Sequence, residues 1–438
     1  MSKSKICFVP GPIHLFWITG IYFYFDLKDD YDIILIVGSE YKNNQQFKNI
    51  SHLFYTVYYL NDDQKNLFLR HRNFYNVAKT IITNHEPKFV FQHNHVYPFD
   101  IYLFNMSRCT GAFNISFQIG FQHKDPKAEH MILKSRRINM SHQYSRLKLP
   151  FWAIFFRVTL KEFISYYKNY YLIPILITGK TLLTPFDPFT HSIKKGSNRN
   201  RHYDLHLVPS LGDAIKTKTE NVINILQIKY PVSDNYLNVQ RMLYGNLERN
   251  KKSIIILPDG AVSDYMFIKG KRSENELIKY LSDTWKEVIE ILQKKFNNHA
   301  VGIKIHPAQK DDRIWNKVIL KLKLAFPDLT VYNPSEDATR LIIESRIIVA
   351  EASTILWFAK NLEKEKILIS LNLFNQLLSD AYSNEQGILY FKSLEELNRY
   401  DFQKANSFVE IISEQLTLKS LLIELEKIGV NGVLESKT

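Results

Sequence analysis

Cysteine is scarce in this chain, since Cys7 and Cys109 are the only two among 438 residues. Two thiols cannot form the disulfide framework of a small secreted domain, so we expect two buried free cysteines and a reducing compartment. Long apolar runs are also missing. The best ones, 149–156 and 170–179, reach about half of the ~18 to 20 residues that a membrane span needs. We therefore expect a cytoplasmic protein, either soluble or peripheral at the inner face of the membrane.

Several catalytic motifs are absent as well. There is no Gly-x-Ser-x-Gly, no P-loop and no Gly-x-Gly-x-x-Gly. The motifs typical of α/β-hydrolases, P-loop kinases and Rossmann dehydrogenases are therefore absent from the sequence. A metal-dependent transferase would need an Asp-x-Asp pair, and the adjacent acids Asp62-Asp63 do not form one. We interpret Asp62-Asp63 and Asp311-Asp312 as acidic charges at helix starts. Zinc on the histidines of segment 93–95 is disfavoured, because three well-oriented ligands and their supporting partners are not evident. We expect no metal and no cofactor.

Positive charge is what the chain has in excess. A formal net charge of +13 and a pI near 9.3 favour anionic partners: nucleotide phosphates, acidic glycans, nucleic acid or an anionic membrane leaflet. The basic residues cluster beside an apolar stripe and form no nucleic-acid motif, so a nucleic-acid partner is not expected.

Apolar strand segments alternate with helical periodicity in both halves of the chain, which predicts two doubly wound, Rossmann-like α/β domains. The expected strands are 5–9, 33–37, 89–92, 115–119, 204–209 and 222–228, then 253–257, 301–305, 329–331, 346–350 and 366–369. The expected long helices are 63–84, 99–109, 274–296, 311–326 and 408–428. We predict a first domain over 1–232, a second over 233–403, and closing helices with a tail over 404–438.

A basic and aromatic insertion, 127–202, interrupts the first domain. Its apolar residues recur at helical spacing: Trp152, Phe155, Phe156, Leu160, Phe163, Ile164 and Tyr167. Arg157, Lys161 and Lys168 lie off this stripe. Two interpretations stay open: the stripe packs on its own domain or on a second subunit, which would make a homo-oligomer, or it docks on an anionic membrane surface.

Two segments of the second half combine phosphate-binding residue types with strand ends. Strand 301–305 leads into His306-Pro307, and strand 346–350 leads into Glu351-Ala352-Ser353-Thr354. A strand end followed by a helix start presents unpaired N–H groups and a positive dipole end, which favour a bound anion. Pro307 fits such a position, since proline in a first helical turn loses no needed donor.

These segments resemble the His-Pro and Ser-Ser/Thr motifs of bacterial sialyltransferases, polysialyltransferases and capsule-type transferases. The likeness covers 304–356, with Lys304-Ile305-His306-Pro307 and Glu351-Ala352-Ser353-Thr354 at its ends. It implies a GT-B fold, in which two doubly wound domains face each other across a cleft. It also implies that His306 contacts the phosphate of a CMP-sugar, while Ser353 and Thr354 hold phosphate or ribose oxygens. Lys304 would help to stabilise the departing phosphate.

The general base is less clearly marked. The sialyltransferase signature has two acids before a glycine, whereas here proline precedes Asp259-Gly260. Asp259 is our first candidate for the base, and Gly260 would let the loop approach the donor phosphate. His95, which follows the expected strand 89–92, is the second candidate because that strand end faces the ligand edge of the sheet.

The sequence thus predicts an inverting, metal-independent glycosyltransferase that moves a sialic-acid-like or Kdo-like acidic sugar from a CMP donor to a glycan or lipid-linked glycan. A CDP-glycerol-type transferase or a UDP-sugar epimerase on the same fold stays open as an alternative. So does a nucleic-acid- or membrane-binding protein without activity.

Overall fold

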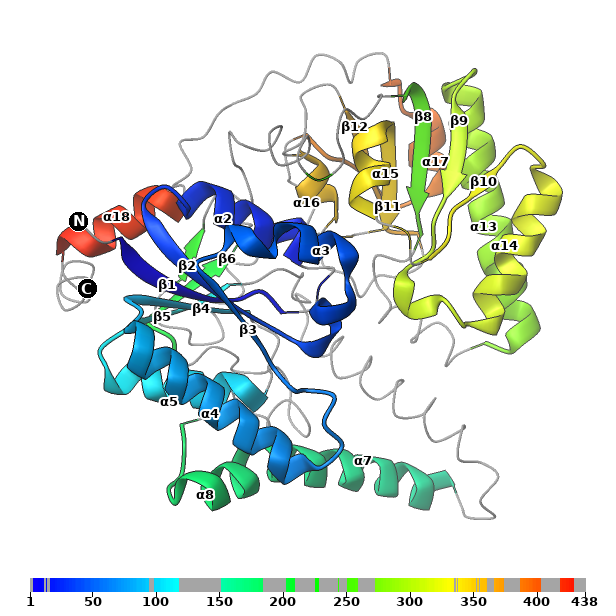
Figure 1. The fold of residues 1–438 in the computed structure, drawn as a ribbon. Coiled ribbons are helices and arrows are strands. Elements are labelled where there is room, and N and C mark those ends of the chain that lie inside the picture. The colour runs from blue at the N-terminus through cyan, green and yellow to red at the C-terminus, as the bar shows by residue number, and fades with distance from the viewer. Residues whose placement is uncertain are drawn as a thin grey trace. The chain divides into compact units, whose positions relative to one another are not determined.

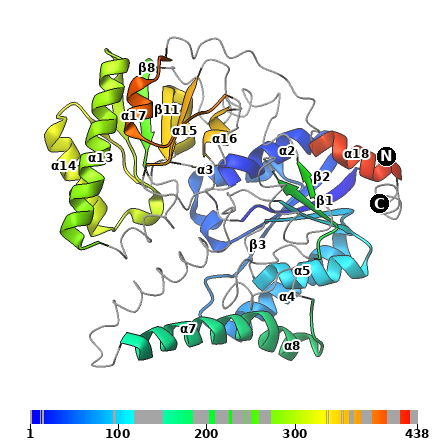
Figure 2. The same ribbon diagram turned by 180° about the vertical axis from the view of Figure 1, so that it is seen from behind.

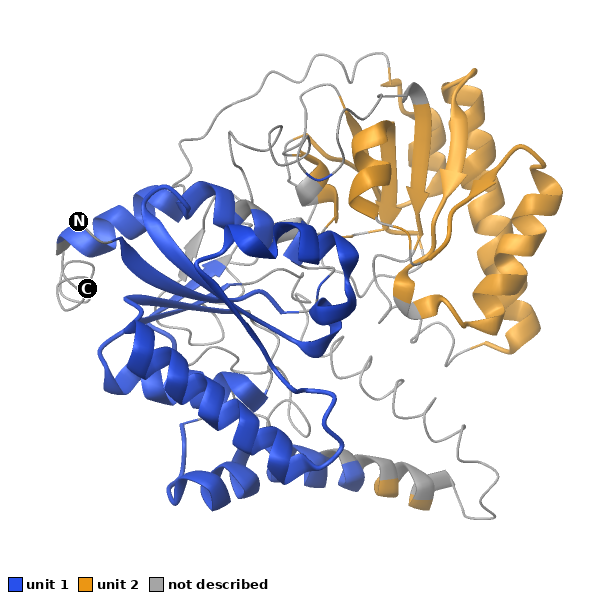
Figure 3. Cartoon of the chain, viewed as in Figure 1, with its two compact units in different colours: residues 1–120, 159–243, 413–438 blue, residues 121–158, 244–412 orange. Residues whose placement is uncertain are grey.

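The computed structural model describes residues 3–11, 13, 16–93, 98–117, 151–183, 202–208, 225–227, 243, 250–258, 272–334, 336, 338–351, 353, 355–360, 366–373, 387–402 and 418–428. They belong to two compact α/β units (Figures 1 and 3). One unit comprises 1–120, 159–243 and 413–438, and the other comprises 121–158 and 244–412. The expected domain boundary at 232 stays a prediction, because residues 228–242 lie outside the described ranges.

The first sheet has the order β3-β2-β1-β4-β5-β6-β7, and every neighbouring pair is parallel. Its strands are β1 (Ser4–Val9), β2 (Tyr31–Val37), β3 (Thr56–Tyr59), β4 (Phe89–His93), β5 (Phe113–Phe117), β6 (Leu205–Val208) and β7 (Ile225–Gln227). Ile34, Leu35 and Ile36 of β2 are all fully buried, as in a parallel strand covered on both faces. This order is that of a doubly wound, Rossmann-like sheet.

Helices of the first unit pack on this sheet and on one another. They are α2 (Ile21–Leu27), α3 (Gln45–Ile50), α4 (Leu67–His85), α5 (Pro98–Cys109), α8 (Ile173–Thr178) and α18 (Leu418–Ile428), with short turns η1 (Phe16–Gly20), η2 (Ser39–Asn43), η3 (Ser51–Leu53) and η4 (Lys168–Leu172). Helix α7 (Phe151–Tyr167) is divided between the units, since 151–158 are assigned to the other unit and 159–167 to this one. The C-terminal helix α18 belongs to this unit, because Lys419 pairs with Asp30 at 2.6 Å and Glu426 with Lys88 at 3.1 Å.

The second sheet repeats the same topology, in the order β10-β9-β8-β11-β12-β13 with all pairs parallel. Its strands are β8 (Asn250–Leu257), β9 (Ala300–Ile303), β10 (Thr330–Val331), β11 (Ser345–Glu351), β12 (Ile367–Leu371) and β13 (Leu389–Phe391). The α/β class and the two doubly wound sheets predicted from the sequence are therefore confirmed.

Helices cover both faces of the second sheet (Figures 1 and 2). They are α13 (Glu274–Lys295), α14 (Arg313–Ala325), α15 (Ala338–Glu344), α16 (Ile355–Lys360) and α17 (Leu394–Arg399), with the turn η5 (Pro307–Gln309). Helix α13 begins at a capping box, in which Ser273 and Glu276 bond each other's backbone N–H groups. Trp285 of α13 and Trp315 of α14 are buried in one core with Ile256 and Val349 of the sheet.

Several sequence expectations need correction. Strand β9 ends at Ile303 rather than at 305, and β5 spans Phe113–Phe117 rather than 115–119. The short strands β3 and β13 were not expected. Cys7 is buried as expected, but Cys109 is exposed because it ends α5 at the surface. Helix α4 begins beyond Asp62, with Asn66 as its cap, and Asp62 instead accepts the N–H of Ser39 at 2.8 Å.

No helix in the described ranges combines the length and the apolar character needed to cross a membrane.

Candidate functional site

The topology of the second sheet brings the two motif segments to one edge. Strand β8 pairs with β9 on one side and with β11 on the other. All three are parallel, so their carboxyl ends lie together, with the ends of β9 and β11 about 10 Å apart by two strand spacings. Chain order reverses between β8 and β11, and ligands of doubly wound sheets bind at such a reversal point. His306 follows β9, and Ser353 follows β11.

Lys304 is a buried cation at this edge. Its N–H donates to the carbonyl of Ile256 at 3.0 Å, which continues the ladder one residue past β9. The side chain is 3% exposed, and its Nζ lies 3.5 Å from the carbonyl of Ile305. In the register of β8 and β9, Ile256 is paired with Ile303, so Lys304 is the first residue after the last pair. Lys304 therefore places a buried ammonium group close to the strand ends.

His306 and Pro307 form the turn that follows. The carbonyl of His306 accepts the N–H of Gln309 at 2.9 Å, and that of Pro307 accepts the N–H of Lys310 at 3.2 Å. Pro307 therefore opens the helical turn η5, as the sequence predicts. The side chain of His306 is half-buried, so its imidazole combines a fixed backbone with a partly accessible ring.

At the end of β11, Glu351 is buried and Ser353 is half-buried. The Oγ of Ser353 accepts the N–H of Ile355 at 3.4 Å, and its carbonyl accepts the N–H of Leu356 at 3.0 Å. Ser353 thus begins α16 in the manner of an N-cap residue. The contact with Ile355 uses the hydroxyl oxygen of Ser353 as an acceptor.

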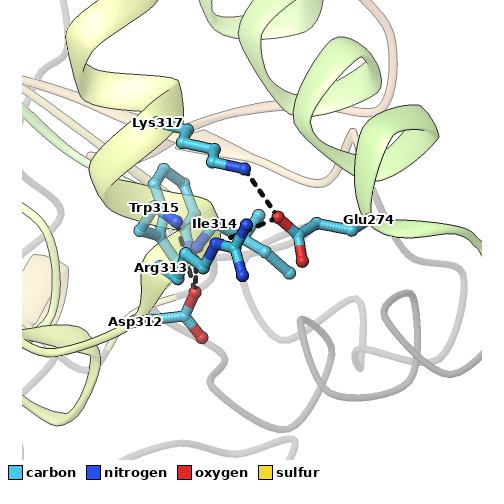
Figure 4. A network of polar contacts seen from close by, with 6 residues as sticks. All are labelled: Glu274, Asp312, Arg313, Ile314, Trp315 and Lys317. Atoms are coloured by element: carbon cyan, nitrogen blue, oxygen red, sulfur yellow. Dashed lines mark hydrogen bonds and ion pairs between the residues drawn. The ribbon is translucent and has the colours of Figure 1, made fainter.

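A polar network fixes the helix starts behind these loops (Figure 4). Asp312 accepts the N–H groups of Ile314 at 2.8 Å and Trp315 at 3.2 Å, which confirms the prediction of an acidic helix start here. Glu274 in the first turn of α13 pairs with Lys317 of α14 at 2.7 Å, and also with Arg313. The network holds the first turn of α14, which follows the His306 turn, against the first turn of α13.

Two further residues at this edge were not found from the sequence. Gln309 is 2% exposed, and neither atom of its amide has a hydrogen-bond partner among the described residues. Asn372 follows β12; its N–H donates to the carbonyl of Phe391 and its Nδ2 to the Tyr390 hydroxyl, both at 2.9 Å, while its buried Oδ1 has no partner in the part of the chain that the structure describes. Buried amides normally have partners, so these two side chains are candidates for contact with a ligand. No sequence signal marks them beyond their position just after strand ends.

Four predicted site residues, Asp259, Gly260, His95 and Thr354, lie outside the described residues. Their roles stay predictions. Among the residues that are described, no group of three or more His, Cys, Asp or Glu side chains is arranged to hold a metal ion.

The first sheet contains one buried polar pair of its own. The hydroxyl of Ser116 in β5 hydrogen-bonds Nδ1 of His206 in β6, and both residues are fully buried. Burial lowers the pKa of His206 to about 4. The imidazole is therefore neutral at physiological pH, which favours a structural role for this pair.

Comparison with protein-family models and with curated proteins finds no match. Solved structures match over nearly the whole chain. MnaA from S. aureus, solved with UDP, aligns at TM-score 0.52 and 12% identity, over 99% of this chain and 98% of its own. The UDP-GlcNAc 2-epimerase of Neisseria meningitidis, bound to UDP-GlcNAc, aligns at TM-score 0.51 and 10% identity, over 97% and 100%. The epimerase of Methanocaldococcus jannaschii gives TM-score 0.51 and 10% identity, over 98% and 100%.

These likenesses show a two-domain, GT-B-like α/β fold. They also overturn the prediction of a CMP-sugar sialyltransferase, because several solved structures that share the fold are described as UDP-GlcNAc 2-epimerases, which fits the alternative held open from the sequence. The physical reason for the error is that His306 and Ser353 were selected as phosphate-binding residue types. Phosphate is common to every nucleotide sugar, so neither motif identifies the base.

Proposed function

We propose that this chain is a UDP-sugar-processing enzyme of the epimerase type, which binds its nucleotide at the carboxyl edge of β9, β8 and β11. The observation that carries the proposal is the position of Lys304, His306 and Ser353 on strand ends that flank the reversal point of the second sheet. The choice of uridine rests on the solved structures of the same fold, whose ligands are UDP and UDP-GlcNAc.

Each site residue has a role in this proposal. Lys304 and His306 balance the charge of the diphosphate, which carries more negative charge than either group alone can offset. The hydroxyls of Ser353 and Thr354 donate to phosphate or ribose oxygens. Gly260, without a side chain, lets the backbone of its loop approach the phosphates.

Two other residues complete the binding edge. Pro307 keeps the turn after His306 helical, and in this proposal the Glu351 carboxylate accepts a hydrogen bond from a sugar or ribose hydroxyl. A carbon centre that inverts by losing and regaining its hydrogen as a proton needs a general base. Asp259 is the first candidate for this exchange because it follows β8, at the centre of the edge, and His95 is the second.

Thermal-shift measurements with UDP, UDP-GlcNAc, CMP, CDP and GDP test the binding, because a ligand that binds only the folded state raises the melting temperature. We expect uridine nucleotides to raise it most. Proton NMR of UDP-GlcNAc incubated with the enzyme then tests the reaction: an epimerised sugar still attached to UDP supports it. The proposal would be contradicted if CMP alone raised the melting temperature. It would also be contradicted if UDP-GlcNAc stayed unchanged and no uridine nucleotide raised the melting temperature.

A further inference from the structure

Helix α7 carries an exposed apolar stripe. Phe156, Leu160, Ile164 and Tyr167 have exposed fractions between 41% and 64%. Their spacing of four, four and three residues places them within an arc of about 80° on a helix of 3.6 residues per turn. Leu172, Leu176 and Leu183, further along the chain, are also exposed. Isolated exposed apolar residues are ordinary, but a continuous row on one helix face marks an interaction surface.

The segment that follows α7 is anchored on the first unit through a different face. Tyr170 and Leu182 are buried in the core formed with α4 and α5. His71 of α4 contacts Asn169 of η4 through Nε2 at 3.2 Å and Tyr102 of α5 through Nδ1 at 3.0 Å. Figures 1 and 2 show α8 beside α4, in agreement with their contacts. The stripe itself is therefore not the surface that holds this segment to its unit.

Positive charge borders the stripe. Arg157 and Lys161 of α7 are exposed, and the helical spacing puts them immediately beside the stripe. Lys168, the first residue of η4, is exposed as well. In residues 151–183 the sequence has four basic residues and one acid, Glu162. An exposed apolar row with a basic flank matches two components of a membrane interface, the acyl boundary and the anionic headgroups.

We propose that α7 and the segment through Leu183 bind in the surface plane of an anionic lipid membrane, with the stripe in the acyl boundary and the basic flank at the headgroups. A second copy of this chain fits less well, because a symmetric contact would bring the same basic residues together. Nucleic acid fits less well too, since it offers phosphates to the basic flank but no apolar surface to the stripe.

Sedimentation of the full chain with vesicles tests this inference. We expect binding to vesicles that contain phosphatidylglycerol, weak binding to pure phosphatidylcholine, and a decline as salt is raised. The double variant Phe156→Ser/Leu160→Ser is expected to weaken partitioning by about tenfold or more, given the apolar area removed. Arg157→Gln and Lys161→Gln should each weaken it by about fivefold, and only for the anionic vesicles.

A matched control is available on the second unit. Leu320 and Leu324 of α14 are 61% and 74% exposed and lie among lysines, so Leu320→Ser/Leu324→Ser removes similar surface from another helix. This control should bind like the unmodified chain, and circular dichroism should show all variants folded. The proposal would be overturned if the control lost as much vesicle binding as Phe156→Ser/Leu160→Ser, or if the chain bound neutral and anionic vesicles equally well. It would also be overturned if light scattering showed a dimer that Phe156→Ser/Leu160→Ser dissociates. Binding to an oligonucleotide with none to vesicles would do the same.

Discussion

Nε2 of His71 lies 3.2 Å from Oδ1 of Asn169, although 98 residues separate them in the sequence. The bond ties α4 to η4, the turn that directly follows the helix with the exposed stripe. Asn169 is itself held by the carbonyl of Ser165, which accepts from its Nδ2 at 2.7 Å. The contact therefore links the core of the first unit to the segment proposed to meet lipid.

This histidine predicts a pH dependence of stability. Burial is the main cause that lowers the pKa of His71 to about 4, as it does for His206. Both rings are neutral in the folded state, whereas the unfolded chain binds protons below about pH 6.5. Stability is thus complete above pH 6.5 and falls as the pH decreases toward 4, by up to about 3 kcal/mol for each histidine.

Urea denaturation at pH 7 and at pH 4.5 measures this effect. His71→Gln and His206→Gln should each reduce the difference in unfolding free energy between the two pH values. The exposed-site variant His52→Gln serves as the comparison, since that residue lies at the surface. A pH difference that is unchanged in both buried-site variants would show that neither ring is held neutral by the fold.

His306→Ala is expected to weaken UDP binding by about ten- to a hundredfold, the worth of one hydrogen bond to a charged group. The fold should stay intact, because the side chain is half-buried in a turn rather than in the core. His299, at the amino end of β9, provides the matched control. Calorimetry should find the UDP affinity of His299→Ala unchanged. If the unmodified chain, His306→Ala and His299→Ala all bound UDP with the same affinity, His306 would not be part of the binding site.

Gln309→Leu tests the buried amide that lacks partners. Replacing it with an apolar side chain of similar size removes an unsatisfied polar group, so the melting temperature without ligand should rise or stay level. UDP-sugar affinity should fall at the same time, because the ligand loses a hydrogen-bond partner. A lower melting temperature together with unchanged affinity would show that the amide serves the fold instead.

Asp259→Asn separates the general base from a binding residue. If Asp259 exchanges the proton, turnover should fall by about a hundredfold or more while the affinity for UDP-GlcNAc changes little. Steady-state kinetics combined with calorimetry distinguishes the two effects. Unchanged turnover would transfer the assignment to His95, and His95→Gln should then show the loss.

The long elements could be predicted from the sequence because their patterns are strong. Helices α13 and α14 have apolar residues at helical spacing, and β2 contains the continuous apolar run 33–37. The edge strands β3 and β13 could not, since they are four and three residues long and mostly half-buried. The end of β9 was placed too late because Ile305 is still buried beyond the last strand residue.

The site was predictable only in part. Lys304, His306 and Ser353 follow strand ends, and parallel topology brings such ends together, so their common edge could be inferred from the sequence. The contribution of Gln309 could not, because the burial of a polar side chain without a partner is a property of packing. Nor could the nucleobase, since the recognised residue types interact with phosphate.

A crystal structure of the chain with UDP tests the proposed site most directly. We predict the diphosphate at the carboxyl edge of the second sheet, within hydrogen-bond distance of Lys304, His306 or Ser353, and with the Gln309 amide facing the ligand. UDP bound at the first sheet alone, with these side chains in contact only with protein, would contradict the proposal.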